Sequence, residues 1–270
     1  MEEDVAVIVC GGAAKNAFDI IDSKDRNPWE QYEEAQNEFG HHFDVLSDKF
    51  STIPKDDLKE IEYALDGKRI VVPFLILGGA VGTGIIRDVI RCARNRNCKV
   101  VSVFGIPMGF EAERRERAFK NLSEVVALSD CSLVVDMQKL MDVNLELNKE
   151  KLWTVFLKMS DRMIRSSIRS IVEFMQGPFF SVFTDRMYAF VPSTDVLPVN
   201  AVTRSWDHLM FDIERATDRS VIMLGSNVRS SEIEDIKNSV AMLCGTIPEI
   251  VIRSDSDDSK VIIFRAVRSF

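Results

Sequence analysis

Two glycine-rich segments contain the residue types in this chain that could support chemistry. The first follows the apolar run Ile70 to Leu77 and precedes a helical pattern of apolar residues. Glycines let a backbone turn tightly and approach a ligand closely, and N–H groups at a helix start favour an anion such as phosphate. A tight turn without any ligand explains the same residues, so both interpretations stay open. The candidate phosphate-binding residues here are Gly78, Gly79, Ala80, Val81, Gly82, Thr83 and Gly84.

The second glycine-rich segment lies near the start of the chain. Val5 to Val9 is typical of a short buried strand, and it runs directly into a Gly-Gly turn and a second helical pattern. The spacing is not GxGxxG, and no acidic residue ends a clear strand about 20 residues on, so a dinucleotide-dependent oxidoreductase is a disfavoured alternative. The candidate residues of this second loop are Gly11, Gly12, Ala13 and Asn16.

The elements around the first segment predict a parallel sheet. Ile70 to Leu77 and Lys99 to Gly105 read as buried strands, and the apolar spacing between them indicates a helix. Strand, glycine turn, helix and strand form a βαβ unit. A charged helix over Phe110 to Leu128 and a short strand over Cys131 to Val135 continue the pattern. The fold class expected from this order is α/β.

The second half of the chain predicts a long helix followed by a smaller α/β domain. Apolar residues recur at three and four positions over Lys149 to Met175 and form one continuous helix face. Strands are expected at Met187 to Val191 and Ser220 to Leu224, with a helix at Ser230 to Cys244. The strand that ends at Arg253 is expected to form a hairpin with the last strand. The predicted divisions are 1–148, 149–176 and 177–270.

Composition narrows the function classes. The chain has 270 residues, 46% of them hydrophobic, and a net charge of −8, which together indicate a soluble globular protein and argue against nucleic-acid binding. Five cysteines without CxxC spacing predict buried free thiols in a reducing cytoplasm. His41-His42 is the nearest approach to a metal motif, and without a second ligand cluster no metal site is predicted. No segment predicts a signal peptide or a direct membrane span.

Four motifs in order resemble the tubulin/FtsZ superfamily of GTP-binding filament proteins. The segment Gly78 to Gly84 is similar to GGGTGTG, and Gly11 to Ala17 is similar to GGAGNNA. Pro107 to Arg115 resembles PFxFEGxxR, and Leu133 to Leu140 resembles LIxIPNDKL. The resemblance implies a Rossmann-like N-terminal GTPase domain with a mostly parallel sheet, a long central helix, and a C-terminal activation-type domain.

The same resemblance assigns a ligand and several roles. It implies GTP or GDP, with Mg²⁺ held chiefly by phosphate oxygens and water. Glu111 would contact the ribose, Arg115 would reach the nucleotide, and Ser160 beside Asp161 would occupy the base-pairing position of the central helix. It further implies head-to-tail self-association into cytoplasmic filaments for cell division, cell shape or membrane remodelling.

Departures from the family pattern concern the base and the hydrolysis step. Met137 stands where the family has the base-reading Asn, and Ala80-Val81 replace Gly-Thr in the phosphate loop. The loop over 178–185 retains a single acid, Asp185, where the family uses acids that enter the neighbouring subunit's site to activate water. We therefore expect GTP hydrolysis to be weak or absent. A non-hydrolysing scaffold or regulator of another FtsZ-type filament is the alternative.

Overall fold

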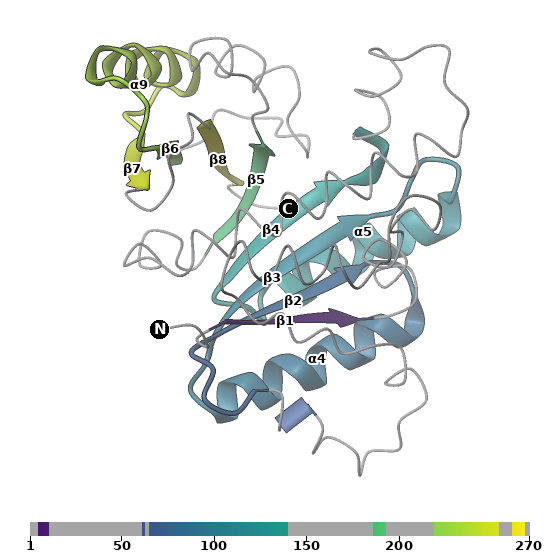
Figure 1. The fold of residues 1–270 in the computed structure, drawn as a ribbon. Helices are drawn as coiled ribbons and strands as arrows, with labels where there is room; N and C mark the ends of the chain where they lie inside the picture. Colours follow the sequence, from purple (N-terminus) through teal and green to yellow (C-terminus); the bar gives the residue numbers. More distant parts are fainter. Residues whose placement is uncertain are drawn as a thin grey trace, which may run out of the picture.

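The computed structural model describes residues 5–10, 61–62, 65–139, 186–192, 219–253 and 261–267. The predicted helix over 149–175 lies outside these ranges, so it and the domain divisions stay predictions. The described strands form one eight-stranded sheet with the order β1-β2-β3-β4-β5-β8-β6-β7. Figure 1 shows this sheet running from β1 through β4 to the strands of the C-terminal half.

The first four strands are parallel and lie side by side in chain order. They are β1 (Val5–Cys10), β2 (Ile70–Ile76), β3 (Lys99–Ile106) and β4 (Cys131–Asp136). Nearly every residue in them is buried, which matches the continuous apolar runs of a parallel sheet covered on both faces. The predicted parallel α/β arrangement is therefore confirmed.

Helices α4 (Ala80–Asn95) and α5 (Ala112–Val126) pack on the same face of this sheet. Right-handed crossovers between adjacent strands in chain order place successive helices on one side. Alternate strand residues share one core cluster with both helices, and Arg87 of α4 pairs with Glu124 of α5 at 2.5 Å. The buried residues that α4 and α5 contribute to this core are Ile86, Val89, Ile90, Cys92, Ala93, Ala118, Leu122 and Val125.

Strand β5 (Arg186–Pro192) joins the two halves of the sheet. It pairs with β4 in parallel through three residues, Arg186 to Tyr188, and with β8 in the antiparallel direction through six, Met187 to Pro192. The join to the parallel half is therefore the shorter one. The three pairs lie at the amino end of β4, on Cys131 to Leu133, away from the carboxyl edge of the sheet.

The C-terminal half contains β6 (Ser220–Gly225), α9 (Ser230–Cys244), β7 (Glu249–Arg253) and β8 (Val261–Val267). The predicted hairpin between the last two strands is wrong, because β6 lies between them. β7 is parallel to β6, whereas β8 is antiparallel to it. A βαβ crossover through α9 seats β7 on one edge of β6 and leaves the other edge for β8.

Among the described residues, no helix is both long and apolar enough to cross a membrane, and no three His, Cys, Asp or Glu side chains gather as metal ligands. Cys10, Cys92, Cys98 and Cys131 are buried free cysteines, as the sequence predicts.

Candidate functional site

The candidate residues that the structure describes gather at the carboxyl edge of the parallel sheet. β2 leads there into the glycine turn, β3 into the loop before α5, and β4 into Asp136 (Figure 1). Cys10 ends β1 opposite Leu75 of β2, so the chain leaves β1 at this same edge. In open α/β sheets ligands bind outside the carboxyl ends of the strands.

Gly78 forms the turn between β2 and α4. Its φ is +86°, a left-handed conformation that glycine adopts without strain. A Cβ at this position would lie 2.1 Å from the Arg114 carbonyl oxygen, and the Gly78 carbonyl accepts a 3.2 Å hydrogen bond from Arg117 Nε. The early turns of α5 thus lie directly against the glycine turn, and only glycine fits between them.

The segment predicted as a glycine loop is largely the first turn of α4. Gly79 is the residue before the helix, with extended backbone, and the helix begins at Ala80. The first turn contains no acidic residue, and a Cβ at Gly79 or Gly84 would meet no atom within 4 Å. The N–H groups of a first helical turn point out of the helix start, which suits an anion.

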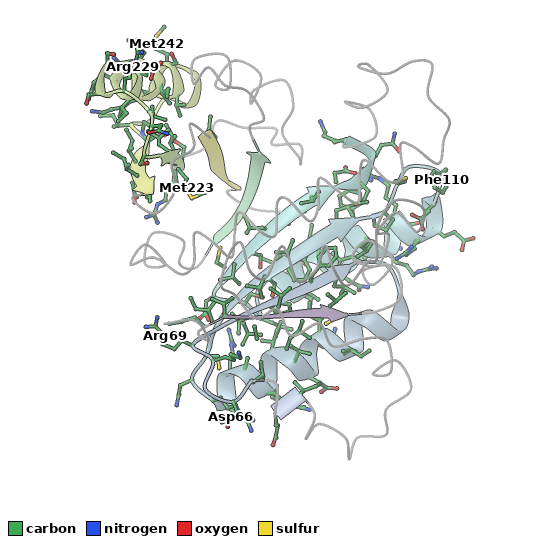
Figure 2. All side chains as sticks on the ribbon, in the orientation of Figure 1. Asp66, Arg69, Phe110, Met223, Arg229 and Met242 are labelled. Atoms are coloured by element: carbon green, nitrogen blue, oxygen red, sulfur yellow. The ribbon has the colours of Figure 1, made fainter. Side chains whose placement is uncertain are left out.

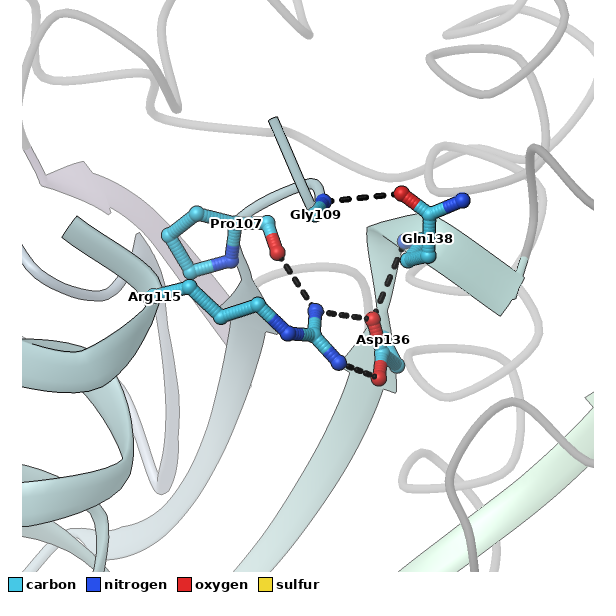
Figure 3. Close-up of polar contacts among 5 residues, drawn as sticks. All are labelled: Pro107, Gly109, Arg115, Asp136 and Gln138. Carbon is cyan, nitrogen blue, oxygen red and sulfur yellow. Dashed lines mark hydrogen bonds and ion pairs between the residues drawn. The ribbon is translucent and has the colours of Figure 1, made fainter. Parts of the chain in front are cut away.

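Glu111 and Arg115 lie at the start of α5. Glu111 precedes the helix, and its carboxylate accepts a 2.7 Å bond from Arg114 Nη1. The Arg115 guanidinium binds Asp136 with two parallel bonds, 2.7 Å from Nη1 to Oδ1 and 2.5 Å from Nη2 to Oδ2 (Figure 3). Such a bidentate pair is among the stronger hydrogen-bonded interactions in proteins.

The pair belongs to a larger network that holds the loop after β3. Arg115 Nη1 also donates to the Pro107 carbonyl at 2.6 Å. The Gln138 N–H donates to Asp136 Oδ1 at 3.0 Å, while Gln138 Oε1 accepts from the Gly109 N–H at 2.7 Å (Figure 3). The end of β4 is thus tied to the 107–109 loop on both sides. Arg115 also stacks over the Phe119 ring at 5.1 Å.

Two further residues limit the chemistry available at this edge. Burial raises the pKa of the Cys10 thiol to about 12, so Cys10 is protonated at neutral pH and is not a nucleophile. Met137, at the position where the family pattern has a base-reading Asn, is 5% exposed and apolar. Phe110 at the tip of the loop is 63% exposed and lies at the far end of α5 from the C-terminal half (Figure 2).

The structure brings together only part of the predicted site. Gly78, Gly79, Glu111 and Arg115 share the carboxyl edge, and the backbone of 80–84 begins α4, although the side chains of 80–83 are not described. Sequence reasoning missed Asp136 and Gln138. The available signal was a carboxylate directly after a buried strand. The predicted residues outside the described ranges are Gly11, Gly12, Ala13, Asn16, Ser160, Asp161 and Asp185.

Two features of the described residues bear on a phosphate ligand. The first turn of α4 contains no acidic residue, which suits phosphate oxygens at a helix start. Arg115, the cation that the resemblance assigns to the nucleotide, is bonded to the buried carboxylate of Asp136.

Comparison with known proteins supports the resemblance at two levels. No family model matches the chain. Over 125 residues, 46% of the chain, it is 29% identical to cell division protein FtsZ 1 of Pyrococcus horikoshii. The matched segment spans 32% of the length of that relative.

Solved structures match nearly the whole chain. A structure of an empty FtsZ dimer from M. jannaschii has a TM-score of 0.70 at 16% identity, and the match covers 98% of this chain and 88% of that one. TubZ of Bacillus thuringiensis serovar israelensis, in GDP-form protofilaments, has a TM-score of 0.63 at 14% identity, over 98% of this chain and 85% of its own. The chain therefore has the tubulin/FtsZ fold. Over less than half of its length, its sequence is also similar to archaeal FtsZ proteins.

Proposed function

We propose that this chain is an FtsZ/tubulin-like cytoskeletal protein that binds GTP or GDP at the carboxyl edge of its parallel sheet. The observation that carries the proposal is the turn at Gly78, which places the start of α4 at that edge. The first turn of α4 contains no acidic residue, and the fold is shared with FtsZ. Backbone N–H groups of the first turn of α4 would hold phosphate oxygens. Mg²⁺, when bound with the nucleotide, would offset phosphate charge and be held chiefly by phosphate and water.

Assembly is proposed to be head-to-tail, because a heterologous contact that does not close propagates into a filament. Self-association is supported by the matched FtsZ structure, which is a dimer, and by the matched TubZ structure, which forms protofilaments. A cytoplasmic role in cell division, cell shape or membrane remodelling would follow. Asp185 would be the one acid available to a neighbouring subunit's site, so hydrolysis is expected to be weak or absent.

Nucleotide content tests the binding proposal. The purified protein is denatured, its released nucleotides are separated by chromatography, and GTP and GDP are titrated into nucleotide-free protein. We expect bound GTP or GDP and saturable binding of both. The absence of bound nucleotide together with no affinity at millimolar GTP would contradict the proposal.

The alternative is a pseudo-GTPase that serves as scaffold or regulator of another FtsZ-type filament. Met137 favours it, since a buried apolar side chain at the base-reading position supplies no hydrogen bond to a guanine edge. Sedimentation with and without GTP separates the two. Pelleting of the chain alone in response to GTP supports the filament protein, whereas pelleting only together with a second FtsZ-type protein supports the scaffold.

A further inference from the structure

Asp136 is more deeply buried than Arg115, so separating the pair costs more at the carboxylate than at the guanidinium. The Asp136 side chain is 6% exposed and that of Arg115 is 23% exposed. A buried carboxylate that loses its cation becomes an uncompensated charge in a poorly solvated place, which is strongly unfavourable. The pair therefore resists any ligand that would draw Arg115 away.

Arg115 lies on the same early turns of α5 that contact the glycine turn before α4. Arg114 and Arg117, its neighbours on the helix, contact the backbone of Gly78. In the family pattern LIxIPNDKL, a proline stands before the Asn position, and Asp136 occupies that place in this chain. The carboxylate is thus a departure of this chain from the family pattern, at a residue that binds Arg115 directly.

We propose that Asp136 sets the nucleotide affinity of this site by holding Arg115 away from the phosphates. Asp136 is a positioning residue that acts through Arg115, and it leaves the site with one cation fewer than the family pattern implies. Backbone N–H groups then supply most of the phosphate contacts, and affinity for GTP and GDP is lower than the arginine would provide. The inference rests on the proposed function.

The hydrogen bond between Gln138 and Asp136 allows a variant that removes the charge of Asp136 alone. The Gln138 N–H donates to Asp136 Oδ1, and the side-chain oxygen of an Asn at this position accepts the same bond. D136N therefore removes the charge and keeps the tie to the 107–109 loop. R115Q/D136N removes both charges. E124Q is the matched control, because it removes the negative charge of a different ion pair, the one between Arg87 and Glu124.

The test is a titration of each full-length, nucleotide-free protein with GTP, GDP and guanosine by calorimetry, repeated at low and high salt. We expect D136N to bind GTP and GDP about tenfold more tightly than the parent, the size of one charge-assisted hydrogen bond. The gain should shrink at high salt and be absent for guanosine, a pattern that general loosening of the fold would not produce. R115Q/D136N and E124Q should stay within about twofold of the parent, since neither releases Arg115.

Different results overturn different claims. If the parent binds GTP and D136N shows no gain in affinity, the inference fails while the proposed function stands. The inference also fails if R115Q/D136N loses about tenfold or more in affinity, because Arg115 then already contacts phosphate in the parent. If all variants are folded and none binds GTP or GDP, the proposed function fails and the inference falls with it.

A measurement without ligand tests the pair itself. Urea unfolding of the parent, R115Q, D136N and R115Q/D136N gives the coupling between the two positions. We expect R115Q to be destabilised most, because it leaves Asp136 buried without this cation, and the double variant to recover much of that loss. Additive effects of the two substitutions would overturn the inference irrespective of nucleotide binding.

Discussion

Asp136 illustrates how one buried charge changes the use of a neighbouring residue. An arginine at the edge of a parallel sheet is well suited to a phosphate, since its planar fork can donate two parallel hydrogen bonds. In this chain a carboxylate at the end of β4 takes both bonds, and the Pro107 carbonyl takes a third. The residue type and place match the family motif, while the partner set by Asp136 decides what the arginine does.

Cys10 gives a pH-dependent prediction at the scale of one residue. Burial raises its pKa from 9.0 to about 12, so above pH 9 the unfolded thiol loses its proton while the folded one keeps it. Stability from this group is therefore complete below pH 9 and declines from there towards pH 12, by about 1.4 kcal/mol per pH unit.

The measurement compares the free energy of unfolding in urea for the parent and C10A across this pH range. We expect the parent curve to fall more steeply than that of C10A above pH 9, where the ordinary thiol titrates. Other groups that titrate at high pH affect both proteins alike, so the difference in slope isolates Cys10. Parallel curves would show that Cys10 does not keep its proton in the folded protein.

At the scale of elements, the turn between β2 and α4 depends on a missing side chain. G78A would place a Cβ 2.1 Å from the Arg114 carbonyl at a φ of +86°. Left-handed strain and the clash together should lower the free energy of unfolding by about 3 kcal/mol or more, because α5 must move away from the turn.

G67A is the control for this prediction. Gly67 also has a positive φ, +70°, but a Cβ there meets no atom within 4 Å. Its expected loss of about 1 kcal/mol reports left-handed strain alone. The free energies come from urea unfolding of both variants beside the parent. Equal losses would mean that the contact between α5 and the turn contributes nothing.

Local patterns were sufficient to predict the elements of the parallel half. The apolar runs that became β2 and β3 are long enough to name a buried strand, and the turn residues between them fix the βαβ order. The pairing of β8 could not be predicted this way, because β7 and β8 have similar apolar patterns and a short polar sequence between them. Which edge of β6 each takes depends on the α9 crossover, a long-range constraint.

The site could be predicted only where the sequence resembles a family motif. Gly78, Glu111 and Arg115 were identified from motif positions and share one edge of the sheet. Asp136 was not, since its role arises from a contact with a residue 21 positions away in sequence. The clash that requires glycine at position 78 likewise comes from α5, which no local pattern around the turn reveals.

At the scale of the whole molecule, the sheet is continuous, and each of its halves contributes to a core cluster among the described residues. Among the described residues, one core cluster combines β1–β4 with α4 and α5 and contains 21 buried residues. The other combines β6, β8 and α9 and contains six. Exposed apolar residues on α9, its following loop and β7, including Met242 at 86% exposed, add no burial to the smaller core (Figure 2).

This asymmetry predicts that the halves unfold at different denaturant concentrations. β5 meets β4 through three residue pairs and β8 through six, so the weaker join separates β1–β4 from the rest. We expect hydrogen exchange followed by mass spectrometry, in increasing urea, to show the β6–α9–β7 peptides opening before those of β2 and β3.

Matched core substitutions assign each transition to a half. Ile86 of α4 and Ile236 of α9 are both fully buried, and replacing either with Ala removes about 2–5 kcal/mol of packing. I236A should move the midpoint of the first transition to lower urea and leave the second in place, whereas I86A should move the second. A single transition that moves to lower urea in both variants would contradict this prediction. It would mean that the short β4–β5 join makes the two halves one cooperative unit.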